Sequence, residues 1–393
     1  MLVNLSIAAL LIWFLVSHQQ NIRATVASRD SIQYWATGKL LLHHQNPYSV
    51  RDVEDLERSA GYSSNRPLMF RCPPWALWIV LLPGLLAPYW AWVVWVALLL
   101  LSLLVSLRMI WRMYGNGRQP SNAFLLAGYL LAPVPACLVA GQVGLLLLLG
   151  ITLFLAWEDE HPFWAGTALI LPMVKPHIFA LLWPVLGIWI LARRKWSQLA
   201  GLCSAFAVAM AITVAFDPAA FVHYNEMLRQ QAIQNEFIPA LSGMIRALFF
   251  HQRFWVQFVP LSLGLLWSAW YFWRNRETWK WRQHGPALLV VAILTTPYAW
   301  MTDETVVLPA MLQAVVWMSE KKLKVRSQLA ILLFVLVNLL LLLIVAFQIP
   351  PATGIYFWSS LVWLSWYLYA RTFVSERTNE SAAVNAPTQV IAS

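Results

Sequence analysis

Apolar segments recur along almost the whole chain, and they constrain its fold more than any other feature of the sequence. Ten of them approach or reach the roughly 20 residues that an α-helix needs to cross a bilayer. They are Leu2 to Val16, Trp90 to Leu107, Val143 to Trp157, Ile178 to Leu191, Leu199 to Phe216, Phe254 to Trp273, Ala287 to Leu294, Thr305 to Met318, Leu329 to Phe347 and Tyr356 to Tyr369. We therefore expect an all-α, multi-pass transmembrane protein with about 11–13 spans.

Composition fits a chain that lies mostly in lipid. Hydrophobic residues make up 60% of the 393 residues and charged residues only 11%, which excludes an ordinary soluble domain. The formal net charge of +10 arises because basic residues gather in short loops between apolar segments, a pattern typical of cytoplasmic loops. These clusters are Arg108 to Arg118, Arg193 to Lys195, Arg274 to Arg282, Lys321 to Arg326, and Arg371 with Arg377. They indicate a lipid bilayer as the partner, and no nucleic acid.

With the basic loops inside, other segments face outward. Residues 18–72 form a long first outer loop and residues 217–253 a second one. The first apolar segment lacks a basic residue before it and a small-residue cleavage site after it, so we interpret it as a retained span. Residues 1–376 then form one polytopic membrane domain, and residues 377–393 a disordered cytoplasmic tail. Pro73 to Ile110 fits either two short spans or an interfacial or re-entrant piece followed by one long span.

The first outer loop opens with the sequence RDSIQYWATGKLLLHHQNPYS, residues 29–49. Asp30 precedes a run whose apolar residues are partly gathered on one helical face, which predicts an interfacial helix at the membrane surface. The helix should end before Pro47, because the residue before a proline avoids the α conformation. A second polar piece, residues 50–66, leads to the paired prolines Pro73 and Pro74.

Five motifs then follow one another along the chain: DSIQYWATGKLLLHHQNPYS, FRCPPWALWIVLLPGLL, GQVGLLLLLGITL, LPMVKPHIFALLWPVL and TTPYAWMTDETVVLPAML. Together they resemble glycosyltransferase family 87, whose members are polyprenol-phosphate-mannose-type membrane glycosyltransferases of the GT-C fold. The resemblance implies a GT-C-like fold and a sugar transferred from a lipid-phosphate carrier to an acceptor at the outer face. It also implies an Asp of the first outer loop as general base. Arg71-Cys72 departs from the family pattern, in which an aromatic residue usually precedes the paired prolines.

Asp30 is the candidate catalytic residue. The resemblance favours a general base that takes the proton of the acceptor hydroxyl. Asp30 followed by Gln33 also has the spacing of a helix capping box, in which the carboxylate accepts backbone N–H bonds at the start of a helix. The sequence leaves both roles open, and one does not exclude the other.

Lys175 is the candidate cation for the donor phosphate. A lysine between two apolar segments costs about 2.5–3.5 kcal/mol at a helix centre, which makes it a functional hypothesis by default. In the alternative, Pro172 and Pro176 break the helix and the ammonium reaches the membrane surface.

The other candidate substrate-binding residues also fall on the predicted outer side. They are His177, Gln142, Arg71, Tyr34, Arg246 and Asp303. His177 has an alternative as a hydrogen-bonded interface residue, and the two arginines as lipid-headgroup contacts. Asp303 with Glu304 has an alternative as a solvated helix start. Asp159 to His161 is interpreted as a charged turn, so no metal ligand is assigned, and dependence on a divalent metal stays open.

The resemblance implies an inverting, polyprenyl-phosphate-sugar-dependent hexosyltransferase of the cell membrane. Its donor substrate is a polyprenyl-phosphate-linked, mannose-like hexose, its acceptor a glycan or glycolipid, and its active site lies on the non-cytoplasmic side. Two alternatives remain. A lipid-linked glycan ligase or polymerase also has many spans and a large outer loop. A lipid flippase or transporter would place paired buried charges along a central path.

Overall fold

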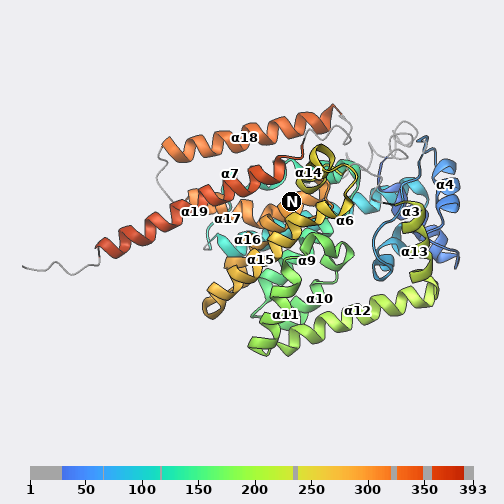
Figure 1. Cartoon of the computed structure of the whole chain (residues 1–393), viewed down its shortest axis with the longest axis horizontal. Coiled ribbons are helices and arrows are strands. Elements are labelled where there is room, and N and C mark those ends of the chain that lie inside the picture. Colours follow the sequence, from blue (N-terminus) through green and yellow to red (C-terminus); the bar gives the residue numbers. More distant parts are fainter. Residues whose placement is uncertain are drawn as a thin grey trace, which may run out of the picture. The chain divides into compact units, whose positions relative to one another are not determined.

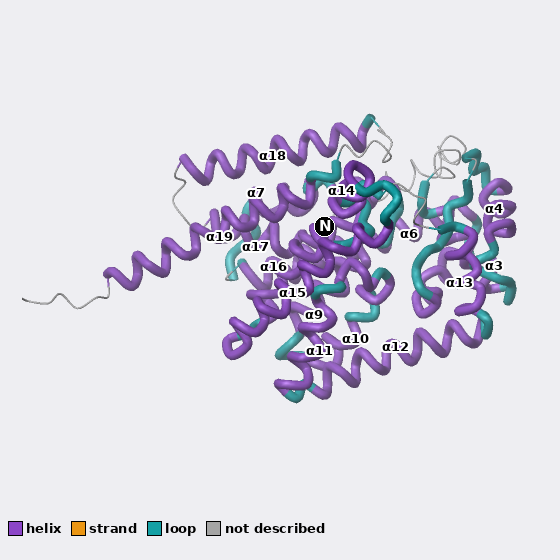
Figure 2. Tube along the Cα trace, viewed as in Figure 1, coloured by secondary structure: helices purple, strands orange, loops and turns teal. Residues whose placement is uncertain are grey.

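The computed structural model describes residues 29–64, 66–115, 117–232, 238–319, 325–347 and 356–384. Within these ranges the chain forms helices and no β-strand (Figure 2), which confirms the predicted all-α class. Two helices, α6 (Pro88–Tyr114) and α12 (Trp196–Phe216), are long and apolar enough to cross a membrane. The expected first span, Leu2 to Val16, lies outside the described residues.

The described residues group into two compact units, where the sequence predicts a single domain. The first unit comprises residues within 29–105, 137–176 and 194–232, and the second comprises the remaining described residues. Three helices, α6, α8 (Pro133–Ala140) and η3 (Pro176–Phe179), contribute residues to both units. Three of the boundaries between the units therefore fall inside helices and not in a linker.

The first unit contains the segment predicted as the first outer loop. Its other helices are α3 (Ile32–Leu42), α4 (Val50–Ser59), η1 (Pro74–Val80), α5 (Leu81–Gly84), α9 (Gly144–Trp157), α10 (Pro162–Ala168), η2 (Pro172–Val174), α12 and α13 (Ala220–Gln230). A short helical piece, η1 with α5, is followed by the single long helix α6, which matches the second of the two forms expected for Pro73 to Ile110.

Helix α3 is buried on nearly every side, so the prediction of an interfacial helix is wrong for this segment. The polar residues Gln33 and Thr37 are 8% and 0% exposed. Helix α4 lies beside α3 (Figure 1), and η1 and α5 pack against α3 as well. Neighbouring helices therefore cover the face that the sequence pattern assigns to water.

A backbone contact sets the distance between α3 and α5. A Cβ atom on Gly38 would lie 2.0 Å from the carbonyl oxygen of Val80, and one on Gly84 would lie 2.3 Å from the carbonyl carbon of Gly38. No side chain fits between the two backbones at these distances, because atoms in contact need more than 3 Å. The sequence places α3 here because both positions are glycine.

The second unit is built around α16 (Trp281–Thr295), most of whose residues are buried. The remaining helices of this unit are α7 (Asn122–Leu130), η3 (Pro176–Phe179), α11 (Leu182–Arg193), α14 (Leu241–Phe249), η5 (Phe254–Phe258), α15 (Val259–Asn275), η6 (Arg276–Thr278), η7 (Met301–Val307), α17 (Leu308–Ser319), α18 (Val325–Ala346) and α19 (Ser359–Val384). Helices α18 and α19 lie side by side (Figure 1), where Trp366 donates to the carbonyl of Ala330 at 3.1 Å.

Helix α19 includes the first part of the predicted tail, residues 377–393. It continues through Val384, so the structure describes residues 377–384 of that segment as helix. Residues 385–393 lie outside the described residues.

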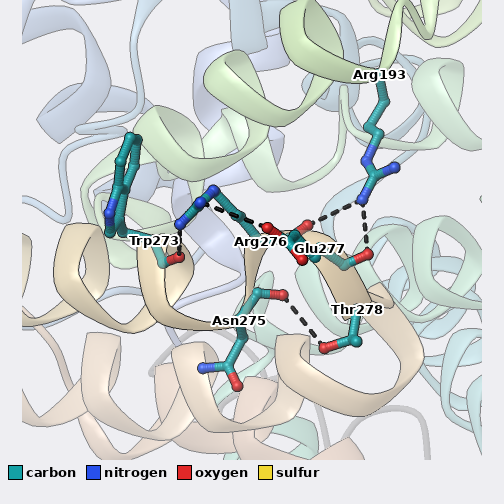
Figure 3. A network of polar contacts seen from close by, with 6 residues as sticks. All are labelled: Arg193, Trp273, Asn275, Arg276, Glu277 and Thr278. Atoms are coloured by element: carbon teal, nitrogen blue, oxygen red, sulfur yellow. Dashed lines mark hydrogen bonds and ion pairs between the residues drawn. The ribbon is translucent and has the colours of Figure 1, made fainter.

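Two of the predicted basic clusters meet at the turn between α15 and α16. The Arg193 guanidinium donates to the carbonyls of Arg276 at 3.0 Å and Glu277 at 2.8 Å (Figure 3). The Arg276 guanidinium lies over the Trp273 ring, 4.5 Å from its centroid. This exposed turn combines cations with an indole ring, a combination that suits a membrane–water interface.

Candidate active site

The Asp30 carboxylate lies at the start of α3 and is hydrogen-bonded to a residue far along the chain. Gln142 Nε2 donates to Asp30 Oδ2 at 2.8 Å, across a separation of 112 residues. The other end of the same amide accepts from the Tyr34 hydroxyl at 3.0 Å. Gln142 therefore links the candidate base to a tyrosine one turn further along α3.

A glycine and an indole place Gln142 against the start of α3. Gly141 has φ +73°, and a Cβ there would lie 2.7 Å from the Ser31 Cβ, so the turn after α8 approaches α3 only because this residue has no side chain. The Trp95 indole donates to the Gly141 carbonyl at 2.7 Å. Its ring also packs against that of Tyr34, with centroids 4.7 Å apart. These contacts orient the Gln142 amide toward Asp30.

The predicted capping box is absent. Ser31 is the N-cap residue of α3, and no side chain caps the first turn of this helix. The backbone N–H of Gln33 donates to the backbone carbonyl of Asp30 at 3.3 Å, and the Asp30 carboxylate accepts from Gln142 instead. The carboxylate therefore does not serve to start the helix.

The surroundings of Asp30 act on its proton affinity in opposite directions. Burial raises the pKa of Asp30 above its ordinary value of 3.8, while the Gln142 hydrogen bond and then the charges of Lys175 and Arg29 lower it. Lys175 is half-buried, between the one-turn helices η2 and η3. A raised pKa makes a carboxylate a stronger base, while the charge of the nearby cation favours its ionised form.

Two tyrosines hold the backbone that carries Arg71. The Tyr224 hydroxyl donates to the Arg71 carbonyl at 3.3 Å, and the Tyr48 hydroxyl donates to the Cys72 carbonyl at 3.0 Å. Burial raises the pKa of Tyr224 to about 12, which the Arg71 charge opposes, and burial likewise raises the pKa of Tyr48 well above its ordinary value. Both phenols thus stay protonated and act as donors. Phe70, which precedes this segment, is fully buried.

Aromatic residues outside the predicted set connect the parts of the site. The Tyr48 ring lies 6.3 Å from that of Phe70, and Phe70 lies 6.0 Å from Tyr34. Trp95 is 2% exposed, and its indole is hydrogen-bonded to the Gly141 carbonyl. Nothing in the spacing of Trp95 separates it from the other tryptophans, whereas Tyr48 stands in the same outer-loop motif as Asp30.

The second unit contains three of the predicted site residues. The His177 ring packs against that of Tyr298, with centroids 5.6 Å apart, and the His177 carbonyl accepts from the Thr296 hydroxyl at 3.4 Å. Arg246 is 8% exposed on α14, with its guanidinium 5.3 Å from the centroid of the Phe254 ring. His177 is thus part of a packed contact with the Thr296 to Tyr298 corner.

Asp303 and Glu304 are buried, so the alternative of a solvated helix start is wrong for both. Asp303 is 0% exposed and its carboxylate accepts from the backbone N–H of Trp300 at 3.1 Å, at the start of η7. Glu304 accepts from the Ser359 hydroxyl at 2.5 Å and from the Trp363 indole at 2.7 Å. Glu304 therefore connects η7 to α19, and Asp303 holds the first turn of η7.

The structure thus joins four of the predicted residues in the first unit by direct contacts or by charge. They are Asp30, Tyr34, Gln142 and Lys175. Arg71 lies in the same unit, and His177, Arg246 and Asp303 belong to the second. Among the described residues no three His, Cys, Asp or Glu side chains gather as a metal site would require.

Comparison with known proteins identifies one family that matches this chain. A model of glycosyltransferase family 87 matches residues 70–319, which is more than half of the chain and includes Arg71, Gln142 and Lys175. The match begins after Asp30 and Tyr34, which the hydrogen bonds of Gln142 connect to the matched part. No curated protein and no solved structure matches the chain.

Proposed function

The chain belongs to glycosyltransferase family 87, and from this premise we propose that it is a multi-pass membrane enzyme of GT-C-like fold. The proposed reaction moves a mannose-like hexose from a polyprenyl-phosphate carrier to a glycan or glycolipid acceptor. Such a transfer needs a base for the acceptor hydroxyl and positive charge for the departing phosphate. The observation that carries the proposal is the Asp30 carboxylate bonded to Gln142 under the charge of Lys175.

Asp30 is the proposed general base. Its carboxylate takes the proton of the acceptor hydroxyl while the oxygen attacks the anomeric carbon. The bond between that carbon and the phosphate oxygen breaks on the opposite face, so the configuration inverts and the lipid phosphate leaves with the electron pair. The proton on Asp30 then passes to water. Gln142 keeps the carboxylate oriented, because its own amide is fixed by Tyr34.

Lys175 is the proposed partner of the lipid phosphate. Its positive charge already acts on Asp30, so a donor phosphate bound to it would bring the anomeric carbon near the base. Arg71 is a second cation of the same unit. The phosphate is a reasonable leaving group once it is paired with cations, so the proposed mechanism assigns no role to a metal ion.

Membrane insertion and sidedness are part of the proposal. The lengths and apolar character of α6 and α12 support insertion, as do the apolar segments of the sequence. The exposed turn of Arg276 and Trp273, held by Arg193 (Figure 3), belongs to the basic clusters proposed to lie in the cytoplasm. The Asp30 site then faces the non-cytoplasmic side, where lipid-linked sugars serve as donors in this proposal.

A transfer assay with an isosteric variant tests the function. Purified protein in detergent is incubated with radiolabelled polyprenyl-phosphate mannose and a membrane lipid extract as acceptor. The native protein should transfer label, and Asp30→Asn should lose about 10²–10⁴-fold in rate, because an amide cannot take the proton. The Asn side chain keeps an oxygen that can accept from Gln142, so folding and donor binding should stay normal.

The matched control is Asp55→Asn, which changes an exposed carboxylate on α4 and should leave the rate unchanged. If Asp30→Asn retains most of its activity, the base lies elsewhere. Movement of the lipid across liposomes without transfer of sugar would instead support a flippase and contradict the proposal.

A further inference from the structure

Helix α4 carries one fully buried acid among exposed charges. Its sequence, VRDVEDLERS, predicts a solvated surface helix, and most of its charged residues are exposed. Val53 and Glu57, four residues apart and so on one face, are both 0% exposed. The Glu57 carboxyl therefore points into the first unit together with an apolar side chain.

The bonding of Glu57 suits a protonated acid. Its Oε2 accepts from the Leu68 N–H at 3.0 Å. Its Oε1 is fully buried and has no hydrogen-bond partner among the described residues. No ion pair with a described cation offsets a charge at this position. Burial in this way disfavours an ionised carboxylate far more than the neutral acid.

The surroundings of Glu57 also favour its protonated form. Burial is the largest cause that raises the pKa of Glu57 from 4.5 to about 8; the Leu68 N–H lowers it, and the charges of Glu54 and Asp30 raise it further. Glu54 lies on the same helix, and Asp30 precedes α3, which packs against α4. Tyr62 follows α4 in the chain. Burial raises the pKa of its phenol, and the charges of Glu57 and Asp30 raise that pKa further. The two carboxyl groups are therefore electrostatically coupled.

We propose that Glu57 is a positioning residue of the Asp30 site, which works only while the Glu57 carboxyl keeps its proton. The inference rests on the proposed function. Leu68, which Glu57 holds, leads directly into Phe70, whose ring contacts Tyr34, and then into Arg71. Ionisation would place a second negative charge beside Asp30 and draw α4 toward water, which loosens this segment.

The test compares Glu57→Gln with the native protein as a function of pH. The amide has the size of the neutral acid, can still accept from Leu68, and never ionises. Native transfer activity should fall on the alkaline side with a midpoint near pH 8, to about a tenth of its plateau at pH 9. Glu57→Gln should fall less than twofold over the same range. Tyr62 does not account for this limb, because its pKa is raised above 10.0.

A second measurement follows thermal unfolding and needs no substrate. Because the folded-state pKa of Glu57 is raised above its unfolded value of 4.5, its contribution to stability is fully present below pH 4.5 and is lost as the pH rises to about 8. Between these two pH values, the melting temperature of Glu57→Gln should therefore rise relative to that of the native protein. If Glu57→Gln fails to fold, Glu57→Met replaces it, because methionine is also neutral at every pH. Its melting temperature should then show the pH dependence expected of the amide variant. The control Asp55→Asn should follow the native protein.

The outcomes separate the two proposals. A native protein that transfers no sugar contradicts the proposed function, and the melting curves then still decide whether Glu57 must be protonated in the fold. An active native protein whose alkaline limb is unchanged in Glu57→Gln overturns the positioning role. Melting curves with the same pH dependence in native protein and Glu57→Gln overturn the protonated state itself.

Discussion

Lys175 acts on the Asp30 carboxyl by its charge, and this gives Lys175→Met two separable effects. The apparent KM for the lipid donor should rise about 10- to 100-fold, because a hydrogen bond to a charged phosphate contributes about 1.5–3 kcal/mol, while the KM for the acceptor changes little. The pKa of Asp30 should rise once the cation is gone. The acidic limb of kcat/KM should therefore move to higher pH, which a profile between pH 4 and 8 measures.

Gln142→Leu separates the two effects. It also removes an interaction that lowers the pKa of Asp30, so its acidic limb should move in the same direction while the donor KM stays the same. An unchanged donor KM together with an unmoved limb in Lys175→Met would exclude Lys175 from the site.

At the scale of residues, the sequence selects side chains that contact one another in the structure, but it does not predict those contacts. Asp30, Gln142 and Tyr34 were all selected from motifs that resemble a family. Their hydrogen bonds depend on the left-handed backbone of Gly141 and on its contact with Ser31, and neither follows from a motif. Glu57 was missed because its neighbours on α4 are solvated charges. Its position four residues after Val53 is the one signal in the sequence.

At the scale of elements, the position of α3 depends on the contact between Gly38 and Gly84. Gly38→Ala should destabilise the protein although alanine favours helix by about 1 kcal/mol. The added Cβ would lie 2.0 Å from the Val80 carbonyl oxygen, and overpacking of this kind costs about 1–3 kcal/mol or more. Because α3 also carries Tyr34, transfer activity should fall with stability.

Gly187→Ala on α11 is the matched control. No atom lies within 4 Å of its added Cβ, so this variant should gain about 0.5–1 kcal/mol. Thermal unfolding of both variants measures the difference. Stabilisation of equal size in the two would mean that α3 and α5 are further apart than described.

The interfacial prediction for α3 failed at this same scale. Polar residues such as Gln33 and Thr37 on one face of a helix usually indicate water, but here packed helices cover that face. The long apolar helices α6 and α12 were predictable because their composition alone specifies them. What covers a mixed face depends on contacts between distant segments, which single-helix periodicity does not contain.

At the scale of the whole molecule, the sidedness of the first outer loop is the main prediction. Ser63 is exposed, whereas Ser49 caps α4 by accepting from Asp52, so Ser63→Cys is the less disruptive probe. Cys203 is the exposed native cysteine, while Cys72 and Cys137 are buried. In a Cys203→Ser background, Ser63→Cys should react with a membrane-impermeant maleimide in intact cells.

Ser197→Cys, exposed beside the basic cluster at Arg193 to Lys195, should react only after lysis. The reverse pattern would invert the topology and move the proposed site to the cytoplasm. Both probes replace an exposed serine by cysteine, so they differ only in their position in the chain.

The hydrogen bond between Asp30 and Gln142 has a consequence for how the protein is made. At about 5–20 residues per second, the ribosome adds the 112 residues that separate the two in about 6–22 s. During that interval the nascent chain has its aspartate without the amide that will orient it. The site is therefore assembled late, after α6 has been synthesised, and a chain stopped before residue 142 would lack it altogether.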